Sequence, residues 1–332
     1  MLAPAFTHIL KPSNTMLDIV KEPHNKDAAA LQSQSSTQSS STQSSGNQLS
    51  STQPSDTQSS TTTAPVRHPS HPSPPQIDNP SHQPNTKKWI LLDLDNTLID
   101  TEHLAFEAAI PVANRILLSK GIIETYSVEK LVSQWFGQTF KAMITKLGEK
   151  HNFEITAEDR KLWAAWEEEA IIAAVAREGQ PCKGAIAVIE KVLADGVYNL
   201  AIVSSSSLKR MLGCLDGVNM RQYFKDEHIF SANTSLPVPT PKPASDVYEF
   251  ALKKLGITAE EAVAVEDSRG GLLAASGAGI DTIGYLGCIN MPAQQAQLAA
   301  DFEAEGAAGV MWRWDQFFDI LAKVEAKVEN GE

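Results

Sequence analysis

The hydrophobic pattern of the chain changes abruptly at Trp89. A short apolar run over 89–92 leads into Asp93-Leu94-Asp95, a pattern typical of a fully buried parallel strand followed by polar residues at its end. Helical spacing of apolar residues follows over 102–120, 131–136, 140–147 and 157–176. Because no strand pattern interrupts these segments, the sequence predicts a separate all-helical module of about 75 residues.

Beyond Pro181, strand and helix patterns alternate. Strands are predicted at 200–203, 228–230, 262–265 and 281–285, and helices at 185–194, 208–215, 245–255, 270–278 and 315–328. Gly256 stands where a left-handed residue would end the third of these helices. This alternation predicts an α/β fold, a doubly wound parallel sheet with helices on both faces, into which the helical module is inserted.

The first 86 residues have no sustained hydrophobic pattern. Nearly every residue from Gln32 to Thr63 is Ser, Thr or Gln, and a Pro- and His-rich stretch follows. Such a segment buries too little apolar surface to offset the entropy of ordering its backbone. The sequence therefore predicts a disordered tail over 1–86, an α/β core over 87–101 and 179–332, and a helical cap over 102–178.

Composition limits the kind of partner. With 28 basic and 40 acidic side chains the formal net charge is −12, which argues against nucleic acid or an anionic membrane as the main partner. The three cysteines form no C-x-x-C pair, so we expect neither a disulfide framework nor a zinc site. No apolar run approaches the ~20 residues of a membrane span. We expect a cytoplasmic protein; the Ser-rich tail also resembles an organellar transit peptide, but it has no Arg before Arg67.

Polar residues stand at the predicted ends of several strands, where ligands of open parallel sheets bind. The side chains expected there are Asp93, Asp95, Ser204, Glu266 and Asp267, with Lys242 in a loop beside them. Clustered carboxylates repel one another unless protons or a hard cation intervene, and such oxygen ligands suit Mg²⁺. Taken singly, each motif could be a helix cap, a turn or a solvated loop lysine. Their joint occurrence in this order favours a catalytic site.

Four motifs resemble those of the haloacid dehalogenase superfamily. Asp93-Leu94-Asp95-Asn96-Thr97 resembles its D-x-D-x-T motif, and Leu200–Ser204 its apolar strand ending in Thr or Ser. Lys242–Asp246 is similar to K-P-x-P-D, with Ser245 replacing the usual proline, and Val265–Gly279 resembles the fourth motif. The resemblance covers Trp89 to Gly287, and the helical module is similar to the cap of the sugar-phosphatase and β-phosphoglucomutase branch.

The resemblance implies a role for each residue at the strand ends. Asp93 would be the nucleophile that forms an aspartyl-phosphate, and Asp95 the general acid–base. Ser204 and Lys242 would hold the phosphoryl oxygens. The ligands implied for Mg²⁺ are the Asp93 carboxylate, the Asp95 backbone carbonyl, Asp267, and Glu266 either directly or through water.

The sequence thus predicts a Mg²⁺-dependent phosphatase acting on a small phosphorylated metabolite. Candidate substrate contacts are Ser205 beside the second motif and three residues where capped members keep such contacts, namely Gln138, Thr139 and Lys141. Dehalogenation is disfavoured because dehalogenases of this superfamily lack the second aspartate and the metal. A catalytically idle interaction protein, whose tail carries the function, would have no need to keep a costly cluster of acids.

A sugar phosphomutase is the main alternative. Mutases of this branch resemble D-T-x-x-x-H after the first motif, whereas this chain has Ala105 at the His position. They also carry an Arg where this chain has Phe140, and a polar residue where it has Leu208. These three differences favour water as the phosphoryl acceptor.

The composition of the tail yields the first testable prediction. Removing residues 1–84, so that the chain begins at Asn85, should leave the melting temperature and the turnover unchanged, because the removed segment has little apolar surface to pack. Thermal unfolding and phosphatase kinetics of the two chains would check this, and a large drop in either would refute it.

Overall fold

The structure is a computed structural model that describes residues 88–127, 129–130, 134 and 139–330. The predicted disordered tail and most of the predicted helix over 131–136 lie outside the described residues. In chain order the elements are β1 (Trp89–Leu92), α1 (Glu102–Ser119), α3 (Phe140–His151), α4 (Ala157–Glu178), α5 (Ala185–Asp195), β2 (Asn199–Ser204), α6 (Leu208–Gly217), β3 (Ile229–Ser231), α7 (Asp246–Leu255), β4 (Ala262–Glu266), α8 (Arg269–Gly277), β5 (Asp281–Tyr285), α9 (Pro292–Ala304), β6 (Gly309–Met311) and α10 (Phe317–Asn330). Short 3-10 helices cover Arg221–Tyr223, Asp226–His228, Ala259–Glu261 and Trp314–Gln316.

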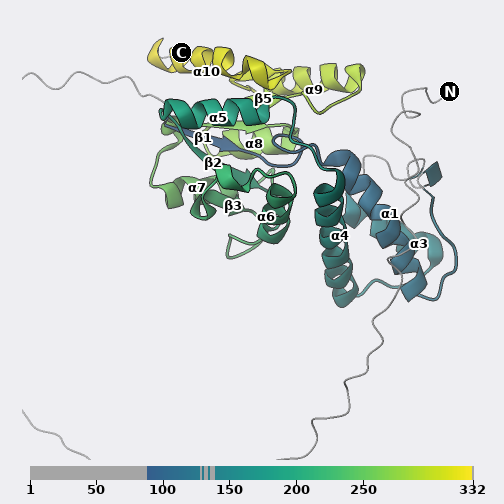
Figure 1. The fold of residues 1–332 in the computed structure, drawn as a ribbon. Coiled ribbons are helices and arrows are strands. Elements are labelled where there is room, and N and C mark those ends of the chain that lie inside the picture. The colour runs from purple at the N-terminus through teal and green to yellow at the C-terminus, as the bar shows by residue number, and fades with distance from the viewer. Residues whose placement is uncertain (1–87, 128, 131–133, 135–138, 331–332) are drawn as a thin grey trace, which may run out of the picture. The chain divides into compact units, whose positions relative to one another are not determined.

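The six strands form one sheet in the order β3-β2-β1-β4-β5-β6, and every neighbouring pair is parallel (Figure 1). The predicted doubly wound parallel sheet is therefore confirmed. β1 lies at its centre, between β2 and β4, so the residues that follow these strands emerge at the same edge.

Alternating residues of β1 serve two hydrophobic cores. Ile90 and Leu92 pack with α5, α6 and α10, whereas Leu91 packs with α7 and α8 on the other face. Successive side chains of a strand point to opposite faces, so the apolar run of this strand supplies both cores. This double burial fixes β1, and with it the position of the acidic residues that follow.

The sequence did not predict α9 or β6. β6 has only three residues, too few for a pattern, and the Ala- and Gln-rich α9 buries only Ala299 and Phe302. Phe302 instead packs over a glycine of β5, because a Cβ added to Gly284 would lie 2.1 Å from its ring. A single large contact of this kind leaves little periodicity in the sequence.

The inserted helices α1, α3 and α4 form the predicted all-helical cap. Their shared core includes Val112, Ile116, Leu147 and Trp163, separate from the cores of the sheet. The two chain segments that connect the cap with the core lie against each other. The backbone N–H of Asp100 donates to the carbonyl of Gln180 at 3.1 Å, and that of Cys182 donates to the carbonyl of Leu98 at 2.8 Å.

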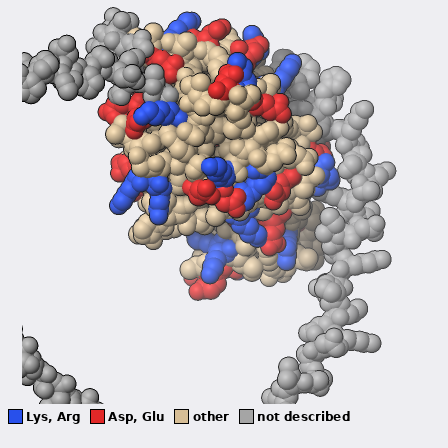
Figure 2. Space-filling view, turned by 60° about the vertical axis from the view of Figure 1, so that its left-hand side comes forward, with Lys and Arg blue, Asp and Glu red and all other residues tan. Residues whose placement is uncertain are grey.

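Charged side chains of both signs are interspersed over the face of the molecule shown in Figure 2. Among the described helices, none is long and apolar enough to cross a membrane.

Candidate active site

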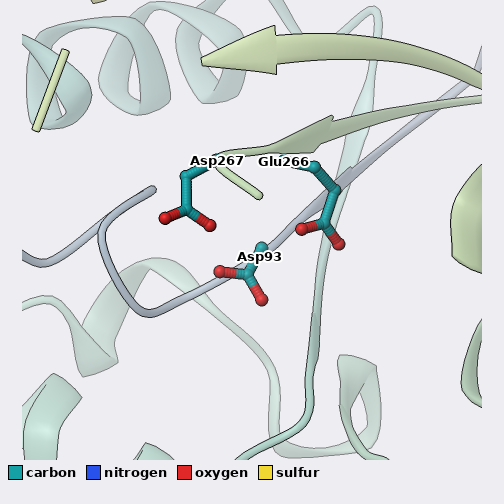
Figure 3. A group of neighbouring side chains, drawn as sticks. All are labelled: Asp93, Glu266 and Asp267. Atoms are coloured by element: carbon teal, nitrogen blue, oxygen red, sulfur yellow. The ribbon is translucent and has the colours of Figure 1, made fainter. Parts of the chain in front are cut away.

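Three carboxylates meet where the adjacent strands β1 and β4 end. Asp93 follows β1, Glu266 is the last residue of β4, and Asp267 comes next. Register between the strands pairs Leu92 with Val265, which brings the residues that follow them together. One carboxylate oxygen from each of the three side chains lies within 4.8 Å of the others, and the groups point toward one another (Figure 3).

Burial makes this cluster electrostatically costly. It raises the pKa of Asp93 above its ordinary value, against the lowering effect of Lys242. It raises the pKa of Glu266 to about 7, again against Lys242. The pKa of Asp267 rises well above its ordinary value because of burial and the negative charges of Asp93 and Glu266. A cation between these groups would offset this cost.

The donor set fits a hard divalent cation. The three side chains offer only carboxylate oxygens, the ligands that Mg²⁺ prefers. Glu266 Oε2 is buried and accepts no hydrogen bond from the residues that the structure describes, whereas buried polar atoms are usually paired. Asp93, Asp267 and Glu266 could therefore hold such an ion.

Lys242 is a buried cation at the same edge. Its Nζ lies 2.6 Å from Asp93 Oδ1 and 2.6 Å from Glu266 Oε1, and it donates to the carbonyl of Val203 at 2.8 Å. Burial opposes its charge, but the carboxylates of Asp93 and Glu266 outweigh this and raise the pKa of Lys242. With a side chain only 7% exposed, it is not a solvated loop lysine.

The carboxylate of Asp95 is held by three side chains from separate segments. Oδ1 accepts from Thr101 Oγ1 at 2.8 Å and from Arg210 Nη2 at 2.9 Å, and Oδ2 accepts from Ser206 Oγ at 2.6 Å. Burial alone would raise the pKa of Asp95, but the charge of Arg210 and these hydrogen bonds bring it below its usual value. Asp95 therefore has a fixed orientation.

The serines of the second motif support the site. Ser204 is buried at the end of β2, and its Oγ accepts from the backbone N–H of Ser206 at 3.1 Å. Ser205 Oγ accepts from the backbone N–H of Lys242 at 3.2 Å, which ties the lysine loop to β2. The substrate contact expected of Ser205 stays a prediction.

The candidate contacts in the cap are described only in part. Thr139 caps α3, since its Oγ1 accepts from the backbone N–H of Ala142 at 3.2 Å. Lys141 is exposed in the first turn of that helix, and Gln138 lies outside the described residues. Their contacts with substrate stay predictions.

Sequence reasoning missed several side chains that hold the site together. Tyr248 donates from its hydroxyl to Glu266 Oε1, and Thr101, Ser206 and Arg210 hold Asp95. Arg210 left a usable signal, because a basic residue in the first turn of a helix opposes the helix dipole and calls for an acidic partner. Tyr248 left no such signal, because it is one of several buried residues on the apolar face of α7.

The chain is similar in sequence to known proteins. Residues 90–285 match the family described as haloacid dehalogenase-like hydrolase. A Thermotoga maritima protein named phosphorylated carbohydrates phosphatase is 26% identical over 58% of this chain and 82% of its own length. The phosphoglycolate phosphatase of Colwellia psychrerythraea is 26% identical over 72% of this chain and 97% of its own.

A solved structure extends the likeness to three dimensions. The HAD family hydrolase of Deinococcus radiodurans, determined with bound phosphate and sodium, is 26% identical and has a TM-score of 0.51. The match covers 72% of this chain and 97% of that one. With the family match spanning more than half of the chain and the carboxylates at the strand ends, this protein belongs to the haloacid dehalogenase-like hydrolases.

Proposed function

We propose that this protein is a Mg²⁺-dependent phosphatase that hydrolyses a small phosphorylated metabolite through an aspartyl-phosphate on Asp93. The family and the phosphatase names of its relatives support an enzyme that hydrolyses phosphoric monoesters. The observation that carries the proposal is the contact of Asp93 with the buried Lys242 inside a cluster of carboxylates.

Asp93 is the nucleophile. Its carboxylate oxygen attacks phosphorus in line with the leaving oxygen, so that a P–O bond to Asp93 forms as the ester bond breaks. Water then cleaves the acyl-phosphate and restores the carboxylate. The fixed position of β1 holds this group, since the strand is buried on both faces.

Asp93 and Asp267 would hold Mg²⁺ directly. When bound, the ion supplies positive charge that screens the nucleophile from the phosphate. Glu266 is already engaged through Oε1 with Lys242 and Tyr248, so we assign it mainly to orienting the lysine. Its unpaired Oε2 remains available to the ion or to a water between them.

Lys242 and Ser204 bind the phosphoryl oxygens, where negative charge spreads in the transition state. Lys242 is suited to this because its ammonium group is held at fixed distances by Asp93 and Glu266. A group fixed before the reaction needs little reorganisation as the charge develops.

Asp95 transfers the protons. The free enzyme favours the carboxylate of Asp95, so the residue must take up a proton in the complex with substrate before it can act as the acid. It gives this proton to the departing oxygen, and in the second step it takes one from the attacking water. These two transfers return the residue to its starting protonation state.

The names of the relatives support a choice of substrate class. Their printed names point to phosphorylated carbohydrates and phosphoglycolate, which form the first substrates to be screened. Phosphate release with Mg²⁺ is the measurement. Conversion of β-glucose 1-phosphate to glucose 6-phosphate, faster than phosphate release, would instead indicate the phosphomutase.

Replacing the nucleophile tests the covalent mechanism. Asp93→Asn should lower kcat by roughly a thousandfold or more, because an amide does not attack phosphorus. The melting temperature should not fall, since the substitution removes one charge from a repelling cluster. Asp315→Asn, at an exposed position, is the control. An Asp93→Asn variant retaining several per cent of activity would contradict the mechanism.

Metal removal tests the ion site. EDTA should abolish phosphate release and Mg²⁺ should restore it, whereas Ca²⁺, which favours more ligands, should substitute poorly. Mg²⁺ should also raise the melting temperature of the metal-free protein, since a ligand of the native state stabilises it. Asp267→Asn should lose both responses. Unchanged activity in chelator would show that no metal is required.

Two neighbouring glycines test the role assigned to Glu266. A Cβ on Gly271 would lie 1.7 Å from Glu266 Oε2, whereas a Cβ on Gly270 meets no atom of the described part of the chain within 4 Å. Gly271→Ala should displace Glu266 and the lysine that it orients, lowering kcat by about tenfold or more. Gly270→Ala should behave as wild type. Equal kinetics of both variants would mean that the placement of Glu266 is unimportant.

A further inference from the structure

Arg210 lies between the acid–base residue and the cap. Its Nη2 donates to Asp95 Oδ1 at 2.9 Å, and its Nη1 lies 3.6 Å from Glu167 Oε1 on α4. Arg210 belongs to α6 of the core, whereas Glu167 belongs to a cap helix. One guanidinium group thus connects a carboxylate of the core with a carboxylate of the cap.

This ion pair is more buried than its neighbours. The side chains of Arg210 and Glu167 are 17% and 19% exposed. Lys209 and Glu169, next to them on the same two helices, are 59% and 64% exposed and lie 3.6 Å apart. Exposed pairs contribute little because water screens them, whereas breaking a largely buried pair leaves a poorly solvated charge.

Two further contacts hold α4 against the start of α6. The hydroxyl of Ser207 donates to Glu168 Oε2, and Lys209 Nζ lies 3.2 Å from Glu168 Oε1. Carboxylates are favourable near a helix N-terminus, so this end of α6 suits an acidic partner. These contacts hold α4 against the start of α6 and thereby place Glu167 beside Arg210.

Among the side chains that hold Asp95, Arg210 is the donor that also contacts α4 in the described part of the chain. Arginine is suited to such a place because its planar group has several donors in fixed directions. A change in the position of Glu167 would therefore shift Arg210, one of the two side chains that donate to Asp95 Oδ1.

We propose that Arg210 is a positioning residue. Through its contact with Glu167, it makes the orientation of Asp95 depend on the position of cap helix α4 relative to α6. The proposal rests on the proposed function, in which Asp95 protonates the leaving oxygen. A general acid must lie within hydrogen-bond reach of the atom that it protonates, so a displaced Asp95 slows the chemical step. Binding of the phosphate by Lys242 and Ser204 would be unaffected.

The test compares two esters that differ in how much they need the acid. Phenoxide leaves poorly without a proton, whereas p-nitrophenoxide leaves readily. Arg210→Gln should lower kcat/KM for phenyl phosphate, which covers the step in which the ester bond breaks, by about tenfold or more, and should affect kcat/KM for p-nitrophenyl phosphate much less. Arg210→Lys should be more active than Arg210→Gln, since lysine keeps the positive charge but lacks the planar set of donors of a guanidinium group.

A second set of variants separates positioning from a general structural effect. In an Asp95→Asn background, Arg210→Gln should have no further effect on either ester, because the residue through which it acts is absent. Glu167→Gln should repeat the selective loss on phenyl phosphate, whereas its matched control, Glu169→Gln, should not. Melting temperatures of all variants show which of them are folded.

The outcomes distinguish this proposal from the proposed function. A wild-type protein that releases no phosphate from either ester with Mg²⁺ would argue against the function itself. If the wild type is active, equal losses of kcat/KM on both esters, a higher kcat/KM of Arg210→Gln, or a full additional loss in the Asp95→Asn background would overturn the positioning role.

Discussion

The repulsion among Asp93, Glu266 and Asp267 is the constraint to which the rest of the site responds. Parallel pairing of β1 with β4 forces their ends together, and burial removes the water that would otherwise screen the charges. Lys242 offsets part of this repulsion, and the proposed cation would offset the rest. The carboxylates alone would repel a phosphoryl group on Asp93, so the positive charge that favours it must come from Lys242 and the proposed cation.

Much of the surrounding structure serves to keep that cluster in place. Tyr248 and the bare backbone of Gly271 confine Glu266, and Ser205 anchors the loop that carries Lys242. Tyr248 and Ser205 lie 18 and 37 positions from the residues that they contact, so these two contacts form only in the folded chain. Each contact holds a side chain of the site in one place, which reduces the reorganisation needed as charge develops during the reaction.

The sequence was informative where local pattern and family motifs coincide. The buried run before Asp93 and the strand before Glu266 predicted both the sheet and the edge at which these acids lie. It was uninformative where structure depends on one tertiary contact, as in α9, whose Phe302 packs over Gly284. The contact of Arg210 with Glu167 was missed for the same reason, since a contact between helices of core and cap has no fixed spacing in sequence, although a basic residue in the first turn of α6 did indicate an acidic partner. Domain boundaries and the substrate contacts of the cap stay predictions.

The paired connections of the cap have an evolutionary consequence. Leu98 and Cys182, 84 positions apart (182 − 98 = 84), are hydrogen-bonded neighbours, so the chain leaves the core and returns to it at nearly the same point. Replacing everything between such points need not alter how far apart β1 and β2 lie, nor their register. Lineages can therefore lengthen, shorten or exchange the intervening helices while inheriting the same sheet, as long as Thr101 still contacts Asp95 and a carboxylate still lies beside Arg210. Under that condition, substrate preference and reaction chemistry can change through separate mutations within one gene.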